Sequence, residues 1–373
     1  MLIGLDETLY HQTSDPFSVT GTSDHRFFDR YWFSGLAPDG SVAFFSGTGR
    51  YPNMGTRDAF LNVLVGDHQH NQRTAVPMEE LADVDAQTAR VGAFSVTVLE
   101  PFRRLVLRSS DGPLNAELEF TTDMAPHLEA KHREMAGTRL IQEQHRYDQV
   151  GHWNGWIDVA GDRIDVNHWW GDRDHSWGTR VDVGGLESRE MFRRIPSFTI
   201  WCSFSTEACW GLFQSREFAD GSQRYLDGSI HRRDGVTARV TDLASDISYV
   251  EGTRIWARAE FDVSLSDDTT VHLVAEPHTL RPWASRGGGY NRGFSDGLGF
   301  GARRGEVLEH DVYTLPDVTR VLLDGVELDP GHREQLARIT VDGAPGWAHL
   351  PIMPRSGDMT SQGSSEEEES WPG

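Results

Sequence analysis

Hydrophobic and polar positions alternate along most of the chain, in short runs separated by turn residues. Alternation with a period of two is typical of β-strands that bury one face. The pattern predicts strands in the first half at 26–33, 41–46, 58–65, 94–99, 104–108, 115–121 and 138–147. In the second half it predicts strands at 198–204, 210–217, 224–230, 238–242, 255–264 and 270–277. Residues 79–90 also fit one short helix.

Turn residues join neighbouring strands into hairpins. Pro38-Asp39-Gly40 separates the first two strands, and Ala160-Gly161-Asp162 folds residues 148–159 back onto 163–170. Residues 47–53 are predicted to form a glycine-rich loop, although not a phosphate cradle, because neither Gly-Lys-Ser/Thr nor a helical pattern follows. Residues 283–311 are predicted to be a loop that leads into a strand, and 321–329 and 339–350 complete the second half.

The strand pattern predicts an all-β fold of two consecutive antiparallel barrels or sandwiches. A chain of 373 residues is longer than one hydrophobic core usually serves. We place the boundary in a crossover near residues 190–197, which gives an N-terminal domain at 1–194 and a C-terminal domain at 195–354. The Ser-, Gly- and Glu-rich residues 355–373 are predicted to be a disordered acidic tail.

Composition narrows the class of partner and the compartment. A net charge of -22 without a basic run argues against nucleic acid. Cys202 and Cys209 lie in an apolar segment and are expected to be buried free thiols in a reducing compartment. The N-terminus shows no signal peptide, and no apolar run reaches the roughly 18 residues of a membrane helix. We expect a soluble, cytoplasmic monomer or homodimer, which is compatible with peripheral membrane contact.

The segment from Gly171 to Arg180 holds two acids, two arginines, a histidine and a tryptophan, and Asn167-His168-Trp169-Trp170 precedes it directly. No Val or Ile occurs between Val166 and Val181, although strands favour such residues. We expect the hairpin before this segment to present it at its far end, where segments held by a rigid scaffold often carry chemistry. The segment is therefore the predicted active site.

Three features resemble the carotenoid 1,2-hydratase superfamily. They are the aromatic hairpin near residue 30, the run Arg173-Asp174-His175-Ser176-Trp177-Gly178 and the late run Arg304-Gly305-Glu306-Val307-Leu308-Glu309. The resemblance in strand rhythm covers about residues 25–350. It implies two lipocalin-like barrels packed side by side, with a hydrophobic ligand at or near their interface. Characterised members hydrate isoprenoid double bonds or steer intramolecular cycloadditions.

Hydration of an unactivated alkene needs an acid that protonates carbon, a pocket that stabilises the cation and a base that activates water. Asp174 and His175 are the predicted catalytic relay, since an apolar site raises the pKa of an aspartate and keeps it protonated. Trp169, Trp170 and Trp177 are predicted to face the developing cation. In the alternative interpretation Asp174 forms a salt bridge with Arg173 or Arg180, His175 caps a turn and Trp177 fills the barrel.

Arg173, Tyr290 and Glu309 are the remaining predicted ligand contacts, and Tyr290 or Glu309 would orient water. The glycine-rich residues 286–293 form either a loop over the pocket mouth or an exposed turn. His68-Gln69-His70 and His168 are the candidates for metal ligands, but no cysteine or acid cluster completes either set at a familiar spacing. We predict no metal and no cofactor.

These observations lead to one functional prediction and two alternatives. The prediction is a cofactor-independent hydratase, or a related lyase or isomerase, that acts on a hydrophobic isoprenoid, steroid-like or polyketide molecule. The first alternative is a non-catalytic carrier of such ligands, in which Asp174 and His175 only hold a turn. The second is a pericyclase-type biosynthetic enzyme, in which the shape of the pocket matters more than an acid.

Overall fold

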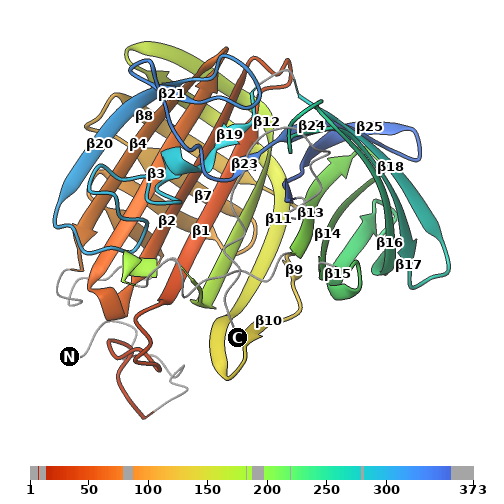
Figure 1. The fold of residues 1–373 in the computed structure, drawn as a ribbon, viewed down its shortest axis with the longest axis horizontal. Helices are drawn as coiled ribbons and strands as arrows, with labels where there is room; N and C mark the ends of the chain where they lie inside the picture. Colours follow the sequence, from red (N-terminus) through yellow and green to blue (C-terminus); the bar gives the residue numbers. More distant parts are fainter. Residues whose placement is uncertain are drawn as a thin grey trace, which may run out of the picture.

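The computed structural model describes residues 7, 14–78, 87–181, 183–186, 197–218, 220–278 and 281–353. Nearly all regular structure in these residues is β-strand, and Figure 1 shows two strongly curved antiparallel sheets side by side. The predicted all-β fold with lipocalin-like barrels is therefore confirmed.

The first sheet is built mainly from the first half of the chain. Along the sheet, the strands from this half run in the order β4-β3-β2-β1-β12-β11-β8-β7-β6-β5, and β9 and β10 both pair with β11. Their bounds are β1 Phe27–Leu36, β2 Val42–Tyr51, β3 Thr56–Val65, β4 His68–Pro77, β5 Thr88–Val91, β6 Phe94–Glu100, β7 Arg104–Ser109, β8 Leu114–Thr121, β9 His127–Leu128, β10 His132–Ala136, β11 Arg139–Val159 and β12 Asp162–Thr179.

The first sheet curls until its two ends approach each other around a filled core. Gln72 on β4 donates to Ser109 Oγ and to the Leu114 carbonyl, both at 3.0 Å, and so joins β4 to the turn between β7 and β8. Phe44, Phe120 and Trp153 lie in the buried cluster inside this curl. The interior of the first barrel is therefore occupied by its own side chains.

The second sheet is a closed barrel of eight antiparallel strands. Closure comes from the pairing of β13 with β14, and β26 adds to the outside of β13. The bounds are β13 Ser197–Thr206, β14 Cys209–Phe218, β15 Gln223–Arg232, β16 Thr237–Tyr249, β17 Trp256–Leu265, β18 Thr270–Pro277, β24 Leu336–Val341, β25 Ala344–His349 and β26 Ile352–Met353. Cys202 and Cys209 are buried in this barrel, as predicted.

One segment of the second half returns to the first sheet. Strand β20 pairs with β4 over its whole length and extends that sheet together with β21 and β22. The short elements here are β19 Trp283–Ala284, the 3-10 turn η6 Ser285–Gly288, β20 Val307–Thr314, β21 Leu322–Leu323, β22 Val326–Glu327 and β23 Arg333–Glu334. Two further 3-10 turns are η2 Pro52–Met54 and η4 Val183–Gly185. The domain division at residue 194 stays a prediction, since residues 187–196 lie outside the described part of the chain.

Three local predictions need correction or restriction. Residues 47–51 of the predicted glycine-rich loop belong to β2, because Gly47 and Gly49 continue the ladder with β1 and β3. Of the predicted helix, residues 88–90 lie in β5, while 79–86 and the tail 354–373 are outside the described residues. The motif from Gly171 to Thr179 is part of β12 and not a loop, since β1 and β11 pair with it on both sides.

A second buried cluster lies where the two barrels pack together. It contains large aromatic side chains from the first sheet, among them Trp32, Phe45 and Phe60, and Trp210 from the second barrel. Trp283 stacks on Phe45 with a centroid distance of 4.6 Å. This face of the first sheet, which we call the inter-barrel face, positions the candidate site.

Candidate functional site between the barrels

Alternation along β12 divides the predicted active-site motif between two faces. Asp172 accepts a hydrogen bond from Ser203 Oγ and contacts His349, both in the second barrel, so Trp170, Asp172, Asp174 and Ser176 share the inter-barrel face. The residues between them project to the opposite face of the strand. The predicted relay of Asp174 with His175 is therefore wrong as a direct contact, because successive residues of a strand point apart.

The glycines that frame the motif have packing roles. A side chain at Gly171 would collide with the Trp153 indole and the Ser34 carbonyl oxygen, two groups that are joined by a 2.7 Å hydrogen bond. Gly178 has φ +136° and lies against the backbone of Glu143 on β11. These two glycines let β12 pair closely with β1 and β11.

His175 lies in an aromatic cluster on the first-barrel face of β12. Its Nε2 is 2.7 Å from Asp29 Oδ1, and the rings of Tyr31 and Tyr147 lie 4.5 Å and 5.3 Å from its own. Trp177 joins this cluster at 5.2 Å. The structure thus brings His175 and Trp177 together, away from Asp174.

The other predicted contacts lie in three different places. Arg173 is buried on the first-barrel face and donates to the Tyr147 hydroxyl at 2.5 Å. Trp169 packs in the core of the first barrel. Glu309 on β20 accepts hydrogen bonds from Ser295 and lies 3.5 Å from Arg73 Nε. Arg173 and Trp169 thus lie on the opposite face from Asp174, whereas Glu309 lies on the inter-barrel face of the first sheet, several strands away from Asp174.

Asp174 lies within a group of buried acids and one arginine. Arg146 on β11 donates to Glu129 Oε1 at 2.7 Å and lies 3.7 Å from Asp148 Oδ1. The indole N–H of Trp201, in the second barrel, donates a hydrogen bond of 3.1 Å to the same Glu129 oxygen. Asp148 is opposite Asp174 in the ladder between β11 and β12. Three carboxyl groups therefore surround one guanidinium.

Burial favours a proton on two of these carboxyl groups, Asp174 and Asp148. Burial raises the pKa of Asp174 to about 6, with Arg146 opposing the shift and Glu129 adding to it. Burial, and next the charge of Glu129, raise the pKa of Asp148 well above its ordinary value. Asp174 remains partly exposed while Asp148 is buried. Asp174 is therefore the most exposed of the three carboxyl groups.

A charged histidine lies next to the acids. His349 Nδ1 is 3.3 Å from Asp172 Oδ2, its Nε2 is 3.0 Å from Glu334 Oε2, and its ring stacks on Trp32 at 4.7 Å. Burial alone would lower the pKa of His349, but Asp172 and Glu334 raise it to about 9. The imidazolium therefore neutralises the charge of Asp172. Its ring also holds Trp32 in place by stacking, and Trp32 lies opposite Asp174 in the ladder between β1 and β12.

Arg30 and Tyr290 complete the surroundings of Asp174. Arg30 lies opposite Ser176 on β1, and Tyr290 comes from the segment between η6 and β20. The ring centroid of Tyr290 is 4.7 Å from the guanidinium carbon of Arg30. Gly287, Gly288 and Gly289 are buried against the first sheet. This part of the segment 286–293 is therefore neither an exposed turn nor a loop over a pocket mouth.

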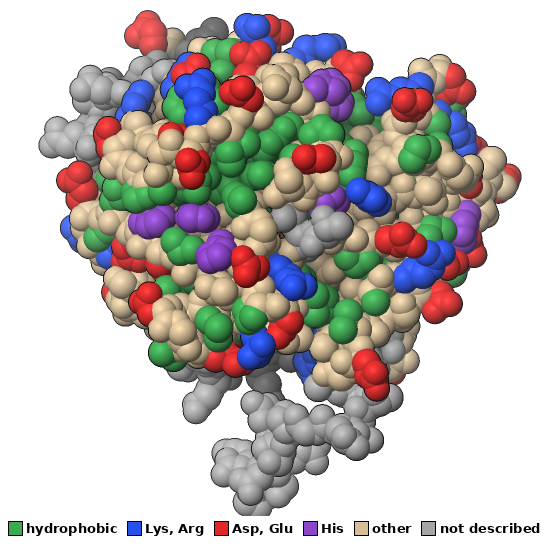
Figure 2. Space-filling view, turned by 90° about the horizontal axis from the view of Figure 1, so that it is seen from above, with side chains coloured by type: hydrophobic (Ala, Val, Ile, Leu, Met, Phe, Trp, Pro, Cys, Tyr) green, Lys and Arg blue, Asp and Glu red, His purple; other side chains and the backbone are tan. Residues whose placement is uncertain are grey.

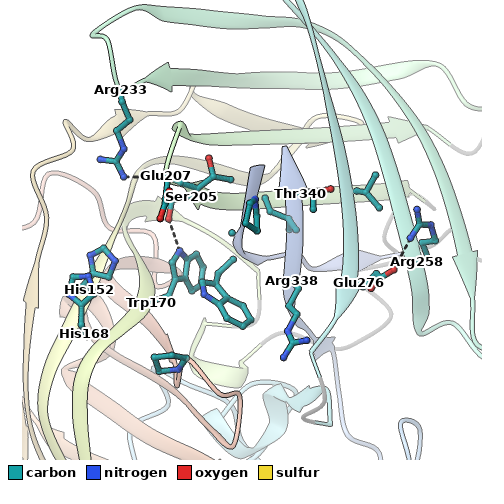
Figure 3. Close-up of a pocket in the computed structure, with 17 residues that line it drawn as sticks. His152, His168, Trp170, Ser205, Glu207, Arg233, Arg258, Glu276, Arg338 and Thr340 are labelled. Atoms are coloured by element: carbon teal, nitrogen blue, oxygen red, sulfur yellow. Dashed lines mark hydrogen bonds and ion pairs between the residues drawn. The ribbon is translucent and has the colours of Figure 1, made fainter. Parts of the chain in front are cut away.

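A pocket of about 1010 Å³ lies further along the same face, and Trp170 is among the residues that line it. Figure 3 shows Trp170 beside His152 and His168 of the first sheet, with Arg338 on β24 and the Arg258–Glu276 ion pair of the second barrel opposite them. Seen from above, the molecule has hydrophobic side chains gathered near the middle of its upper part, among charged ones (Figure 2). The buried pair Asp172 and His349 lies between Trp170 and Asp174, so the pocket does not reach the acid.

The sequence singled out Asp174 and Tyr290, which lie near each other, but not the other groups that surround them. Successive residues of a strand point to opposite faces, and this period of two was the signal that could have placed Asp174 and His175 on different faces. No local pattern marks Arg30, Arg146 or His349, which reach the site from other strands. Within the described residues, no group of three or more His, Cys, Asp or Glu side chains is arranged to hold a metal ion.

No helix in the described residues is long and apolar enough to cross a membrane.

Solved structures share this fold at low sequence identity. A protein from Nitrosomonas europaea named as an AttH is 14% identical with a TM-score of 0.53, over 92% of this chain and 98% of that one. CghA with Sch210972 is 12% identical with a TM-score of 0.52, over 89% of each chain. Kievitone hydratase from Nectria haematococca is 10% identical with a TM-score of 0.49, over 90% of this chain and 93% of that one.

The likeness to the first two of these structures shows that this chain shares their fold, in agreement with the lipocalin-like β-barrels expected from the sequence. No curated protein sequence matches the chain. A family model, described as a family of unknown function (DUF8625), matches residues 2–346. This match covers most of the chain, which therefore belongs to that family.

Proposed function

We propose that the protein is an enzyme that transfers a proton from Asp174 to a carbon atom of a hydrophobic small molecule bound between the barrels. The reaction class is hydration of a carbon–carbon double bond, or the related elimination or isomerisation. The observation that carries this proposal is a partly exposed carboxyl group whose pKa is raised to about 6 among buried acids. A carboxyl group that is still partly protonated near neutral pH can act as the general acid that carbon protonation requires.

The surroundings of Asp174 support the same chemistry. Trp32, Phe60 and Tyr290 supply an aromatic wall, while Ser176 Oγ, at 3.4 Å, is a weak partner for the acid. Asp174 is thus not fixed in a salt bridge with Arg173, whose guanidinium contacts Tyr147 on the opposite face. In hydration, the carbon receives the proton of Asp174, water bonds to the neighbouring carbon, and the proton that water releases restores the acid.

Deuterium incorporation tests the proposal whatever the final product is. The wild-type protein is incubated in D2O with a panel of unsaturated isoprenoid alcohols and carboxylic acids, and new carbon–deuterium bonds are measured by mass spectrometry. We expect Asp174→Asn to lower the rate of incorporation by about 100-fold or more, since general acid catalysis contributes that much. Asp165→Asn, an exposed position on the same strand, is the matched control and should leave the rate unchanged.

The outcomes separate the candidate functions. Wild-type rates in a correctly folded Asp174→Asn variant would exclude Asp174 as the proton donor. Tight binding of a panel compound by the wild type without any incorporation would contradict the proposal and favour a carrier.

A further inference from the structure

The guanidinium of Arg30 is buried without a hydrogen-bonding partner. Arg30 as a whole is 3% exposed. The Nε and Nη1 atoms of its guanidinium are buried and make no hydrogen bond to any described residue. The ring centroids of Tyr290 and Phe300 both lie 4.7 Å from its central carbon. Aromatic contacts attract the cation, but they do not satisfy its N–H groups.

Two other arginines on the inter-barrel face of the first sheet have acidic partners. Arg73 is also buried and donates to Asp311 Oδ2 at 2.5 Å, and Arg146 donates to Glu129. A buried donor without an acceptor costs free energy, and a buried charge without a partner costs more. The lack of a partner at Arg30 therefore points to an acceptor that the folded chain does not itself supply.

The acids near Arg30 do not fill this role. Asp58 on β3 is occupied by the Tyr51 hydroxyl at 3.0 Å and by the Gly301 N–H at 2.6 Å, and burial raises its pKa. Asp174 lies diagonally across the ladder between β1 and β12, about 7–8 Å away between Cα atoms for such a pair. Tyr290 adds a hydroxyl that also makes no hydrogen bond within the described residues.

We propose that Arg30 and the Tyr290 hydroxyl bind a carboxylate of the substrate and hold it beside Asp174. A carboxylate matches the planar edge of a guanidinium with two parallel hydrogen bonds and supplies the acceptors that Arg30 lacks, in addition to the through-space attraction of Asp58 and Asp174. The carboxylate-binding site stands by itself, while its role in orienting the reacting carbon rests on the proposed function. The substrate class is a hydrophobic unsaturated carboxylic acid.

The site also selects the reaction within that class. A fixed guanidinium repels a developing carbocation but stabilises negative charge on carboxylate oxygens. Water therefore adds to the β-carbon of an α,β-unsaturated acid, and the π electrons move toward the α-carbon and the carboxylate. The α-carbon takes the proton of Asp174, and the proton lost by the added water returns to the Asp174 carboxylate, so that atoms and charge balance.

Binding of a matched pair of probes tests the carboxylate site independently of turnover. Geranic acid and geraniol share one carbon skeleton and differ in the carboxylate, and their dissociation constants are measured by calorimetry on the full chain at pH 7.5. We expect the wild type to bind geranic acid about 30-fold or more tightly than geraniol. Arg30→Met should remove this preference, whereas Arg50→Met, at an exposed position on the adjacent strand β2, should keep it.

Two further variants keep failure of this proposal distinct from failure of the proposed function. Asp174→Asn should retain the preference for geranic acid even where deuterium incorporation is lost. Arg30→Lys should fold and bind geranic acid more weakly than wild type, because an ammonium cannot form the two-pronged contact.

Thermal unfolding distinguishes a ligand site from a structural cation. Removing an unsatisfied buried guanidinium should leave the Tm of Arg30→Met unchanged or raised, since no hydrogen bond is lost. The proposal is overturned by equal wild-type affinity for the two probes or by lack of binding of both. A large fall in Tm with the probe preference retained overturns it as well.

Discussion

At the scale of single residues, the charge state of His349 connects the stability of the protein to the site. Its two ring nitrogens face Asp172 and Glu334, and its pKa is raised to about 9. A histidine in the unfolded chain has a pKa of about 6.5. The stabilisation that protonated His349 gives to the folded state is therefore complete below that pH. It is then lost as the pH rises through about 9.

We therefore predict that the free energy of unfolding falls by about 3 kcal/mol between pH 6.5 and pH 9, as expected for this shift of a buried group. Urea unfolding at several pH values measures the fall. His349→Gln removes the titrating group and should show a smaller decline over the same window. Parallel pH profiles for the two proteins would contradict the assigned charge of His349.

Residue identity predicted part of the site. Asp174 was singled out because polar and charged residues crowd the segment 171–180, and burial raises the pKa of its carboxyl group. The pairing with His175 failed, since adjacent strand residues point to opposite faces. Arg30, Arg146 and Glu129 were out of reach because their proximity to Asp174 depends on strand register, which one sequence does not specify.

At the scale of elements, β12 is the strand that distributes functional groups between the two faces of the first sheet. Its hairpin with β11 was predictable, because Ala160 and Gly161 form a turn with positive φ between two alternating runs. The placement of residues 171–179 in the strand was not, because the motif lacks the β-branched residues typical of strands. Pairing on both sides and burial between the barrels override that local preference.

The close packing of β12 makes Gly171 sensitive to substitution. We predict that Gly171→Ala destabilises the protein by about 1–3 kcal/mol, since the new methyl group collides with Trp153 and with the Ser34 carbonyl. The same substitution at Gly21, around which no atom lies within 4 Å, is the matched control. Chemical denaturation of both variants provides the measurement, and equal effects at the two positions would refute this role.

At the scale of the whole molecule, both barrels contribute to the environment of one acid. Glu129, which raises the pKa of Asp174, is held by Trp201 of the second barrel, and Asp172 is bound by Ser203 and His349. The alternation of hydrophobic and polar residues predicted two barrels, because the hairpins of each barrel join segments that are neighbours in the sequence. The return of β20 to β4 was not predicted, because a pairing between strands more than 200 residues apart leaves no local signal.

The central claim is that the packed barrels keep Asp174 protonated well above the ordinary range of an aspartate. The most direct measurement is a carbon-13 NMR titration of the side-chain carboxyl groups, with the Asp174 signal assigned by its loss in Asp174→Asn. The account predicts a midpoint near pH 6. A midpoint at or below about pH 4, the value of an unperturbed aspartate, would contradict it.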